Sequence, residues 1–244
     1  MESNLKDIID NHERIALQFS GGKDSLACLY LLRPYWDRLT VYWTDTGDAF
    51  PETLELIERV AAMVPRFERI AGNQPAVIEL FGIPSDLVPV GSTPIGVIAT
   101  GSGVLIQDRY SCCVRSLMLP MHERMVQDGI TLVIRGQKNT DRLRAPVESG
   151  TVENGIEFLF PIQDWDDAQV MAYLRENDIE IPRFYELLKA SPDCMTCSAY
   201  WEEGRAAYLR QHHPEAYDEY QKRLNAISAA TAEAIANFNT EITG

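Results

Sequence analysis

The sequence lacks any apolar run that approaches the ~18 residues needed to cross a bilayer. Its first residues, MESNLKDIIDNHER, lack the basic-then-apolar order of a secretory signal and read instead as a short helix. We therefore expect a cytoplasmic protein without a membrane partner. Its 244 residues suffice for one large α/β domain, or for one domain with a small appendage.

Positive charge is also scarce, because 22 Lys and Arg residues face 36 Asp and Glu residues, for a formal net charge of −14. A surface of this sign repels a nucleic-acid backbone unless a local basic patch overrides it. Nucleic acid is therefore a disfavoured partner, and we take the overall charge to reflect solubility. The apolar content of 45% and charged content of 24% are ordinary for a soluble globular protein.

Metal-binding residue types are few. The four histidines match no ligand spacing: His12, His122, His212 and His213. The five cysteines are Cys28, Cys112, Cys113, Cys194 and Cys197. In a reducing cytoplasm, metal ligation or catalysis explains cysteines better than disulfides do. Cys28 falls on the apolar stripe of a predicted helix, so we assign it to the core.

What the sequence does contain is an alternation of strand-like and helix-like segments. Strands are predicted at residues 15–19, 39–43, 67–72, 130–135 and 157–162. Helical patterns follow the first, second and last of these. This order predicts an α/β fold with a doubly wound, mainly parallel sheet, in which ligands bind beyond the carboxyl ends of the strands.

Two segments stand apart from this alternation. Residues 82–108 are rich in glycine and proline with little periodicity, which predicts a long loop. The chain after residue 198 reads as helical, with a break at His213 and Pro214. We therefore expect a nucleotide-binding α/β domain with the cysteines at residues 1–198 and a helical extension at residues 199–244. The extension is either a dimer arm, which would make a homodimer, or a packing helix.

The stretch IALQFSGGKDSLACLYLL leads a strand through two glycines into a helix. It is not a Walker A loop, but it has the physics of a phosphate cradle: close backbone approach, hydroxyls and a lysine. Asp24 would repel phosphate unless a cation bridged them, so it indicates Mg²⁺ and a polyphosphate. A ligand-free turn is the alternative. The predicted nucleotide-binding residues are Ser20, Gly21, Gly22, Lys23, Asp24 and Ser25, with Lys23 and Asp24 also catalytic.

A second candidate contact follows the next predicted strand. Asp45 ends that strand about 24 residues after Gly21. A doubly wound nucleotide fold places an acid near this position for ribose hydroxyls, although a turn or helix-cap aspartate is the alternative. Thr46 and Gly47 of the same TDTG segment are assigned to nucleotide binding with it.

One segment reverses the overall charge. Residues 135–144 hold four basic residues and a single acid just beyond a predicted strand: Arg135, Lys138, Arg142 and Arg144 against Asp141. Arginine forks suit tetrahedral oxyanions, so the segment predicts a clamp on the phosphates or sulfate of a nucleotide. A solvated loop is the alternative. Lys138, Arg142 and Arg144 are the nucleotide-binding residues assigned here.

The four remaining cysteines form two pairs, adjacent Cys112 and Cys113 and the C-x-x-C of Cys194 and Cys197. Four thiolates suit tetrahedral zinc or a 4Fe–4S cluster. Adjacent cysteine side chains diverge and fit one ion poorly, whereas a cluster spreads its irons and accepts such ligands. We therefore favour the cluster, and zinc and free thiols remain the alternatives.

Together these motifs resemble the PAPS and APS (sulfonucleotide) reductase family within the N-type ATP pyrophosphatase, or adenine nucleotide α-hydrolase-like, superfamily. SGGKDS is similar to the signature loop of enzymes that cleave ATP between the α and β phosphates. DTGDAFPET, the cysteine pair, RGQKNTDRLRA, FPIQDW and CMTC follow in the family's order over residues 13–200. The resemblance implies ATP, APS or PAPS as the nucleotide and a 4Fe–4S cluster on the four cysteines. It also assigns Gly136, Lys138 and Asp141 to a G-x-R-x-x-E type loop.

The sequence departs from this family at two places. The reductases attack the sulfur of their substrate with a cysteine near the C-terminus, and no cysteine follows Cys197. Leu117 stands where the family has a lysine four positions after the cysteine pair, and Arg115 is expected to point elsewhere. The anion loop, in contrast, keeps Lys23, Asp24 and Ser25, the version that resembles ATP-cleaving enzymes.

Three functions therefore remain open. The first is cleavage of ATP to adenylate a substrate for sulfur transfer, with a separate sulfur donor or partner subunit. The second is an APS or PAPS reductase that uses an external thiol. The third is a non-catalytic nucleotide-binding iron–sulfur module. Asp24 favours the first, since a mere binder of a sulfonucleotide has little use for a carboxylate in its anion loop.

Overall fold

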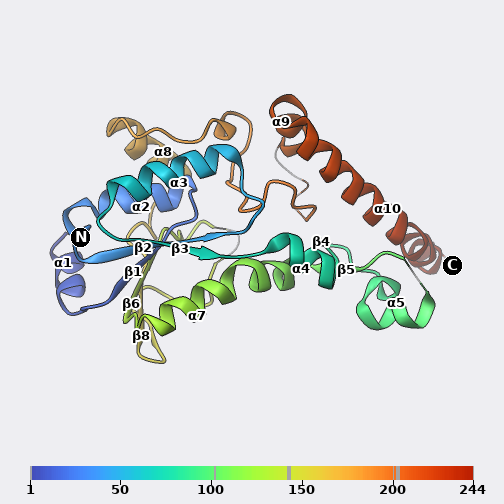
Figure 1. Ribbon diagram of the computed structural model, residues 1–244, viewed down its shortest axis with the longest axis horizontal. Helices are drawn as coiled ribbons and strands as arrows, with labels where there is room; N and C mark the ends of the chain where they lie inside the picture. The colour runs from blue at the N-terminus through green and yellow to red at the C-terminus, as the bar shows by residue number, and fades with distance from the viewer. Residues whose placement is uncertain (1, 102, 142–143, 200, 202–203, 244) are drawn as a thin grey trace. The chain divides into compact units, whose positions relative to one another are not determined.

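The computed structural model describes residues 2–101, 103–141, 144–199, 201 and 204–243 (Figure 1). The chain divides into two compact units. The first unit comprises Met1–Asp45, Phe50–Ala71 and Pro120–Tyr185, and the second comprises Thr46–Ala49, Gly72–Leu119 and Glu186–Gly244. The division into residues 1–198 and 199–244 that the sequence suggested stays a prediction about independent folding.

The first unit is built on a six-stranded sheet in the order β3-β2-β1-β6-β8-β7. The strands are β1 (Ile15–Gln18), β2 (Leu39–Asp45), β3 (Phe67–Ala71), β6 (Leu132–Arg135), β7 (Val152–Glu153) and β8 (Ile156–Leu159). All neighbouring pairs are parallel except β7 with β8. The central strands β1 and β6 are apolar except for their last residues, Gln18 and Arg135, as expected for a sheet covered on both faces. This confirms the doubly wound α/β fold.

Helices surround this sheet: α1 (Glu2–Asp10), α2 (Lys23–Leu31), α3 (Pro51–Met63), α7 (Leu119–Gln127) and α8 (Asp167–Glu176), with short turns η1 (Arg33–Tyr35) and η4 (Arg183–Glu186). α2 packs against α8. Cys28 of α2 is fully buried, so its assignment to the core is confirmed. Asp166 and Gln169 cap α8 through a reciprocal capping box, which fixes where this helix begins.

The second unit contains α4 (Gln74–Phe81), β4 (Ile83–Ser85), η2 (Val90–Ser92), α5 (Pro94–Thr100), β5 (Ile106–Asp108), α6 (Arg109–Cys113), the π-helical segment η3 (Val114–Met118), α9 (Arg205–His212) and α10 (Pro214–Thr243). The expectation of a long loop at residues 82–108 is wrong, because β4 and β5 pair in parallel and α5 lies between them. These elements are too short to show a periodic pattern. The Thr93 side chain caps α5 and Pro94 opens it, a signal that a periodicity reading overlooks.

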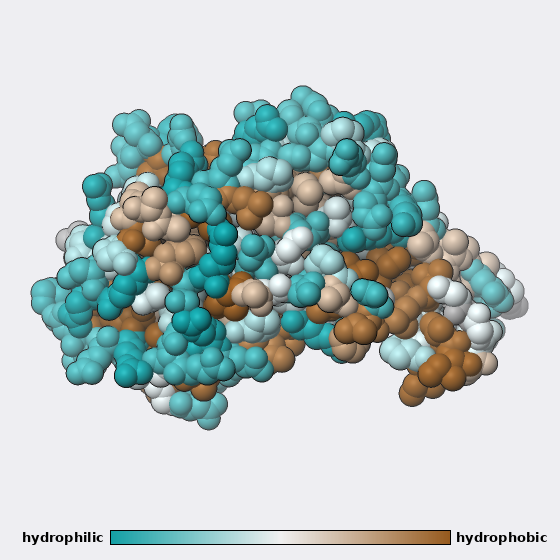
Figure 2. All heavy atoms as spheres, viewed as in Figure 1, coloured by the Kyte–Doolittle hydropathy of each residue, from teal (hydrophilic) through white to brown (hydrophobic). Residues whose placement is uncertain are grey.

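The C-terminal helices break at His213 and Pro214, as the sequence predicted. α10 is buried along its first part, through residues such as Tyr220 and Ile227. Apolar side chains are exposed on and near α5, and Figure 2 shows brown surface in this region; Ile98 is 86% exposed. Over the part of the chain that the structure describes, no helix combines the length and apolar character needed to cross a membrane.

Candidate functional site

The predicted anion loop lies at the carboxyl end of β1, and its last residues open α2. Gly22 is the N-cap and provides no side-chain cap, so the helix presents backbone amides at its positive end. Within the loop, the Gly22 amide donates to Ser20 Oγ (3.3 Å) and Ser25 Oγ donates to the Gly22 carbonyl (3.0 Å). Gly21 has φ +77°, which favours glycine. The loop therefore has the backbone form of an anion cradle.

A tyrosine from η4 closes this cradle. The Lys23 backbone amide donates to the Tyr185 hydroxyl at 2.7 Å. A phosphate oxygen bound at this amide would take the position that the phenol oxygen holds. The sequence analysis did not single out Tyr185, because it lies about 160 residues from the loop and carries no local motif.

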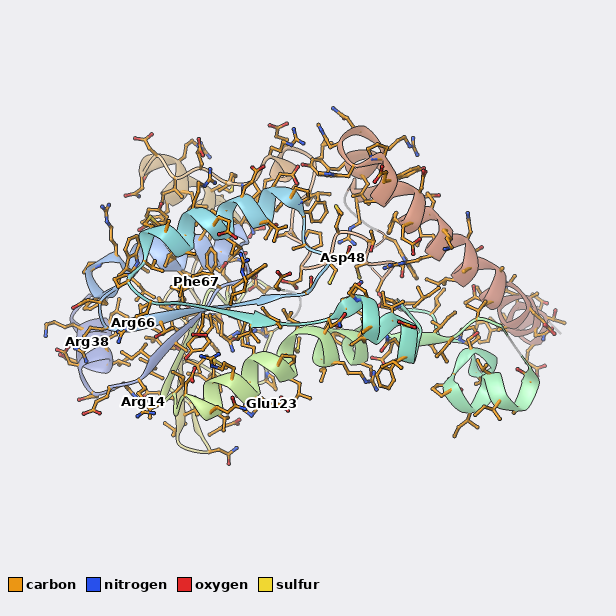
Figure 3. The ribbon with its side chains drawn as sticks, viewed as in Figure 1. Arg14, Arg38, Asp48, Arg66, Phe67 and Glu123 are labelled. Carbon is orange, nitrogen blue, oxygen red and sulfur yellow. The ribbon has the colours of Figure 1, made fainter. Side chains whose placement is uncertain are left out.

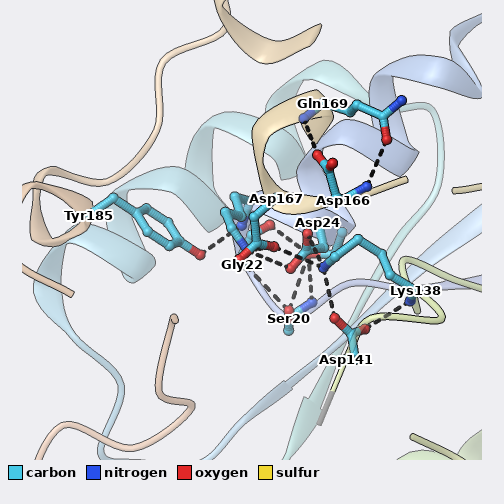
Figure 4. A network of polar contacts seen from close by, with 11 residues as sticks. Ser20, Gly22, Asp24, Lys138, Asp141, Asp166, Asp167, Gln169 and Tyr185 are labelled. Atoms are coloured by element: carbon cyan, nitrogen blue, oxygen red, sulfur yellow. Dashed lines mark hydrogen bonds and ion pairs between the residues drawn. The ribbon is translucent and has the colours of Figure 1, made fainter. Parts of the chain in front are cut away.

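Two lysines and three aspartates form a charged network over the loop (Figure 4). Lys23 Nζ lies 3.0 Å from both Asp24 and Asp167. Lys138 Nζ lies 2.6 Å from Asp24, 2.8 Å from Asp141 and 3.4 Å from Asp167. Two ammonium groups thus face three carboxylates, a net charge of −1.

The network favours the charged forms of Lys138 and Asp167. Lys138 is only 1% exposed; burial lowers its pKa, but its ion pairs with Asp141 and Asp24 outweigh burial and hold the pKa above the usual value. Burial raises the pKa of Asp167, but Lys23 and Lys138 together bring it below the usual value. Lys138 is therefore cationic and Asp167 anionic at neutral pH.

Gly136 joins the end of β6 to the anion loop. A Cβ atom at this position would lie 2.7 Å from the Asp24 carbonyl and 2.8 Å from the Ser25 amide nitrogen. Only glycine permits this backbone approach, which carries Lys138 over the loop. The structure thus brings Gly136, Lys138 and the Ser20–Ser25 loop together.

The other basic residues predicted to clamp a nucleotide are placed differently. Arg142 lies outside the described residues. Arg144 is exposed and lines a polar pocket of about 720 Å³, together with the amide side chains of Gln137, Asn139 and Gln163. The Asn139 amide is held by Asp164 (3.0 Å), and Gln137 accepts from the Ala145 amide (2.8 Å).

The TDTG segment is divided between the units. Asp45 is the last residue of β2 in the first unit, at the carboxyl end of that strand as predicted. Thr46 and Gly47 belong to the second unit. There, Thr46 Oγ1 donates to the Asp193 carbonyl (3.2 Å), and the Thr46 carbonyl accepts from the Gln74 amide (2.8 Å). Their assignment to nucleotide binding stays a proposal.

The four paired cysteines all lie in the second unit and all are free thiols. Cys112 and Cys113 end α6, and Cys194 and Cys197 lie in a turn near residues 193–197. Cys197 lies within electrostatic range of the other three thiols. The structure therefore brings together residues that are about 80 positions apart in the sequence.

Burial dominates the chemistry of this cysteine centre. It raises the pKa of the Cys112 and Cys194 thiols, and it raises that of Cys113 to about 12, with neighbouring thiols adding to the shift. Four convergent thiols that repel one another when ionised are a donor set for a cationic group. Among the described residues, no three ligand side chains approach closely enough to hold one metal ion.

The C-x-x-C turn is held by three charged side chains that the sequence analysis missed. Asp48, labelled in Figure 3, accepts from the Thr196 amide (3.0 Å) and hydroxyl (2.7 Å). Arg205 donates to the Cys197 carbonyl (2.6 Å), and Arg223 donates to the Thr196 carbonyl (3.1 Å). Asp48 belongs to the DTGD motif, so the sequence offered a local pattern by which it could have been found. The two arginines belong to no such motif.

A second pocket in the first unit, of about 430 Å³, lies at the amino ends of the strands. Figure 3 labels three arginines that line it: Arg14, Arg38 and Arg66. Each donates to a backbone carbonyl, such as Arg14 to Asp128 at 2.7 Å and Arg66 to Asp37 at 2.6 Å. These arginines link the segments at the amino ends of the strands through hydrogen bonds to backbone carbonyls. None of the predicted site residues lines this pocket.

The first unit is a doubly wound α/β fold with a glycine-containing loop at the carboxyl end of β1. Residues 14–85 match the model of the phosphoadenosine phosphosulfate reductase domain, which confirms the resemblance read from the motifs. The chain is 22% identical to adenosine 5'-phosphosulfate reductase of Allochromatium vinosum, over 80% of this chain and 72% of the relative.

The chain is also similar to a second curated protein and to one solved structure. Phosphoadenosine 5'-phosphosulfate reductase of Photorhabdus laumondii is 25% identical, with 83% of each chain covered. The crystal structure of phosphoadenylyl-sulfate reductase from Candida auris, a phosphate complex, aligns with a TM-score of 0.49 at 19% identity, over 70% of this chain and 76% of that one.

Proposed function

We propose that the protein binds Mg·ATP and cleaves it between the α and β phosphates to adenylate a substrate for sulfur transfer. One observation carries the proposal: the net charge of −1 in the network of Lys23, Lys138 and three aspartates. A free anionic nucleotide entering this network meets more negative than positive charge. A divalent cation carried in with a polyphosphate reverses that balance, since carboxylates are its preferred ligands.

The chain's own groups then have distinct roles in the cleavage. The loop amides and the Lys23 ammonium stabilise the charge that develops on departing pyrophosphate. Asp24 and Asp167 would hold Mg²⁺, which neutralises the polyphosphate when bound. Lys138, fixed by Asp141, keeps the Asp24 carboxylate in place.

The proposed reaction balances in two steps. An oxygen of the acceptor attacks the α-phosphorus, and the bond to the bridging oxygen breaks, so that its electron pair leaves with pyrophosphate. A hydrosulfide-type donor then attacks the activated carbon; a carbon–sulfur bond forms, the carbon–oxygen bond breaks and AMP leaves. The donor is external to the loop, and the acceptor is a carbonyl or comparable oxygen.

The cysteine centre supports the sulfur-transfer part of the proposal. Its four thiols, two of them buried and two partly buried, are the donor set of a 4Fe–4S cluster, which when bound would supply a site that holds or delivers sulfur. Cys112, Cys113, Cys194 and Cys197 would hold it. The chain contributes a buried environment that excludes water from this group and the turn that orients Cys194 and Cys197.

A second candidate function is favoured by the relatives, which are APS and PAPS reductases. In this case the nucleotide would be a sulfonucleotide, and the reducing thiol would come from outside the sequence, because no cysteine follows Cys197. The Asp24 carboxylate has no use in that reaction.

Calorimetry on anaerobically purified full-length protein separates the two. Mg·ATP, ATP with a chelator, APS and PAPS are titrated into the wild type and into Asp24→Asn. We expect Mg·ATP to bind most tightly, chelation to weaken ATP binding, and Asp24→Asn to remove most of that Mg²⁺ dependence. Tighter binding of APS or PAPS than of Mg·ATP would replace the ATP proposal with the reductase.

A further inference from the structure

The C-terminal helices supply charged groups to the cysteine centre. The sequence analysis assigned this part of the chain only a packing or dimer role. In the second unit, however, α9 begins with Arg205 and α10 carries Arg223, and both guanidinium groups reach the C-x-x-C turn. These contacts raise the question of what two cations do beside four thiols.

The two contacts are built and largely buried. Arg205 is 3% exposed, and its Nη1 donates to the Cys197 carbonyl at 2.6 Å. The Arg223 side chain is 13% exposed; its Nη1 donates to the Thr196 carbonyl at 3.1 Å, and its Nε donates to Glu219 at 2.9 Å. Burying a guanidinium is unfavourable unless hydrogen bonds or opposite charge offset it.

Backbone carbonyls offset only part of that penalty. Arg223 lies within electrostatic range of Cys112, and both arginines lie within range of the Asp48 carboxylate. Four thiolates around a 4Fe–4S core give a unit with net negative charge. Buried cations beside it would stabilise that charge, as partners outside the ligand set commonly do at metal sites.

We propose that Arg205 and Arg223 are positioning residues of the cysteine centre, which hold the C-x-x-C turn and offset the negative charge of a four-thiolate cluster. This inference rests on the cluster part of the proposed function and not on its ATP part. Two components can be separated: a hydrogen-bonding role at the carbonyls of Cys197 and Thr196, and an electrostatic role.

Substitutions distinguish these components. Arg→Gln keeps a hydrogen-bond donor and removes the charge, whereas Arg→Lys keeps the charge. Arg210→Gln is the matched control, because Arg210 lies on α9 but is exposed and donates to Tyr217 (2.8 Å). A purely structural role predicts that Gln substitutes well. An electrostatic role predicts that Lys does.

The experiment measures iron and sulfide content and the midpoint potential of anaerobically reconstituted full-length variants. Reduction adds negative charge, so we expect Arg205→Gln and Arg223→Gln to shift the midpoint potential to more negative values. We also expect them to retain the cluster about 10-fold less tightly against a chelator, the lower end of the effect of outer partners at metal sites. Arg→Lys should restore most of the potential, and Arg210→Gln should match the wild type.

Potentials that are the same in wild type and both Gln variants would overturn the electrostatic role. Thermal unfolding identifies variants that do not fold; if Arg205→Gln is one, the less buried Arg223→Gln decides. A wild type that binds no iron would overturn the cluster and this inference together. A wild type that binds a cluster but not Mg·ATP would overturn only the ATP proposal.

Discussion

The two units contain sites of opposite character. In the first unit, five charged groups pair with one another, and some remain open to water; the Asp167 side chain is 65% exposed. In the second unit, the thiols are buried or partly buried, and the charged groups around them contact backbone carbonyls and amides. In the first site, the ammonium and carboxylate groups form ion pairs with one another. In the second site, the thiols are donor atoms that would bind a positively charged group.

This difference in burial and pairing determines how each site responds to a substitution or a ligand. In the first unit, the ion pairs of the mostly exposed Asp167 side chain can exchange with water, because exposed pairs contribute little free energy each. Buried thiols change only when a partner enters and protons leave. We therefore expect substitutions in the second unit to act in an all-or-none way and those in the first to act by degrees.

The largest effect should come from Cys194→Ser. Loss of one thiolate from a four-cysteine set should abolish the visible absorbance and iron content of the reconstituted protein, measured by spectroscopy and metal analysis. Cys28→Ala is the control, because Cys28 is buried in the first unit and lies apart from this set. Full iron loading of Cys194→Ser would show that the four thiols do not act together.

Lys23→Ala should weaken nucleotide binding by about 1.5–3 kcal/mol, as expected for loss of a charged hydrogen bond. Calorimetric titration with Mg·ATP measures the change. Lys6→Ala provides the control, since this lysine also pairs with an aspartate but lies exposed on α1. An affinity equal to that of the wild type would remove the loop from the nucleotide site.

Gly136→Ala should affect both stability and binding. The added methyl group would meet the backbone of Asp24 and Ser25, which cannot move aside as a side chain can. We expect a loss of about 1–3 kcal/mol in the free energy of unfolding, typical of overpacking, and weaker Mg·ATP binding. Gly103→Ala is the matched control, because its Cβ would meet open space. Equal behaviour of both variants in urea unfolding would contradict the close approach.

The smallest effect should be the pH dependence of Asp167→Asn. Because Lys23 and Lys138 outweigh burial and lower its folded pKa below the ordinary value of 3.8, Asp167 stabilises the fold above that pH, and the stabilisation is lost as pH falls through the folded pKa. For this exposed pair we expect about 0.2–1 kcal/mol. Urea unfolding at neutral and strongly acidic pH should show a gap between wild type and variant only at neutral pH. Asp218→Asn, at an exposed position, should show no such gap.

The fold was predictable where buried strands begin with a run of three apolar residues, as in β1 and β6. It was not predictable at residues 82–108, because β4 and β5 have three residues each and cannot show a period. The anion loop was predictable for a different reason. Two glycines followed by Lys23, Asp24 and Ser25 are a local pattern with a physical meaning.

The partners of these local patterns were harder to find. Asp167 reads in the sequence as an ordinary acid in the first turn of a helix, a favourable position for any carboxylate. The packing of α8 against α2 brings it to Lys23, and the loop after β6 brings Lys138. Arg205 and Arg223 are isolated basic residues in helical sequence, and nothing local distinguishes them from solvent-exposed arginines such as Arg210.

In the proposed nucleotide site, the Tyr185 hydroxyl that accepts from the Lys23 amide would make the anion loop selective among anions. Any ligand that uses this amide exchanges one hydrogen bond for another, so a small anion with a single contact gains little by displacing the phenol. A ligand with several phosphate oxygens engages other donors at the same time and gains the difference. The loop would therefore bind chloride or sulfate weakly at ordinary concentrations and bind polyphosphate chains more tightly. This selection by the number of contacts requires only that the ring of Tyr185 move.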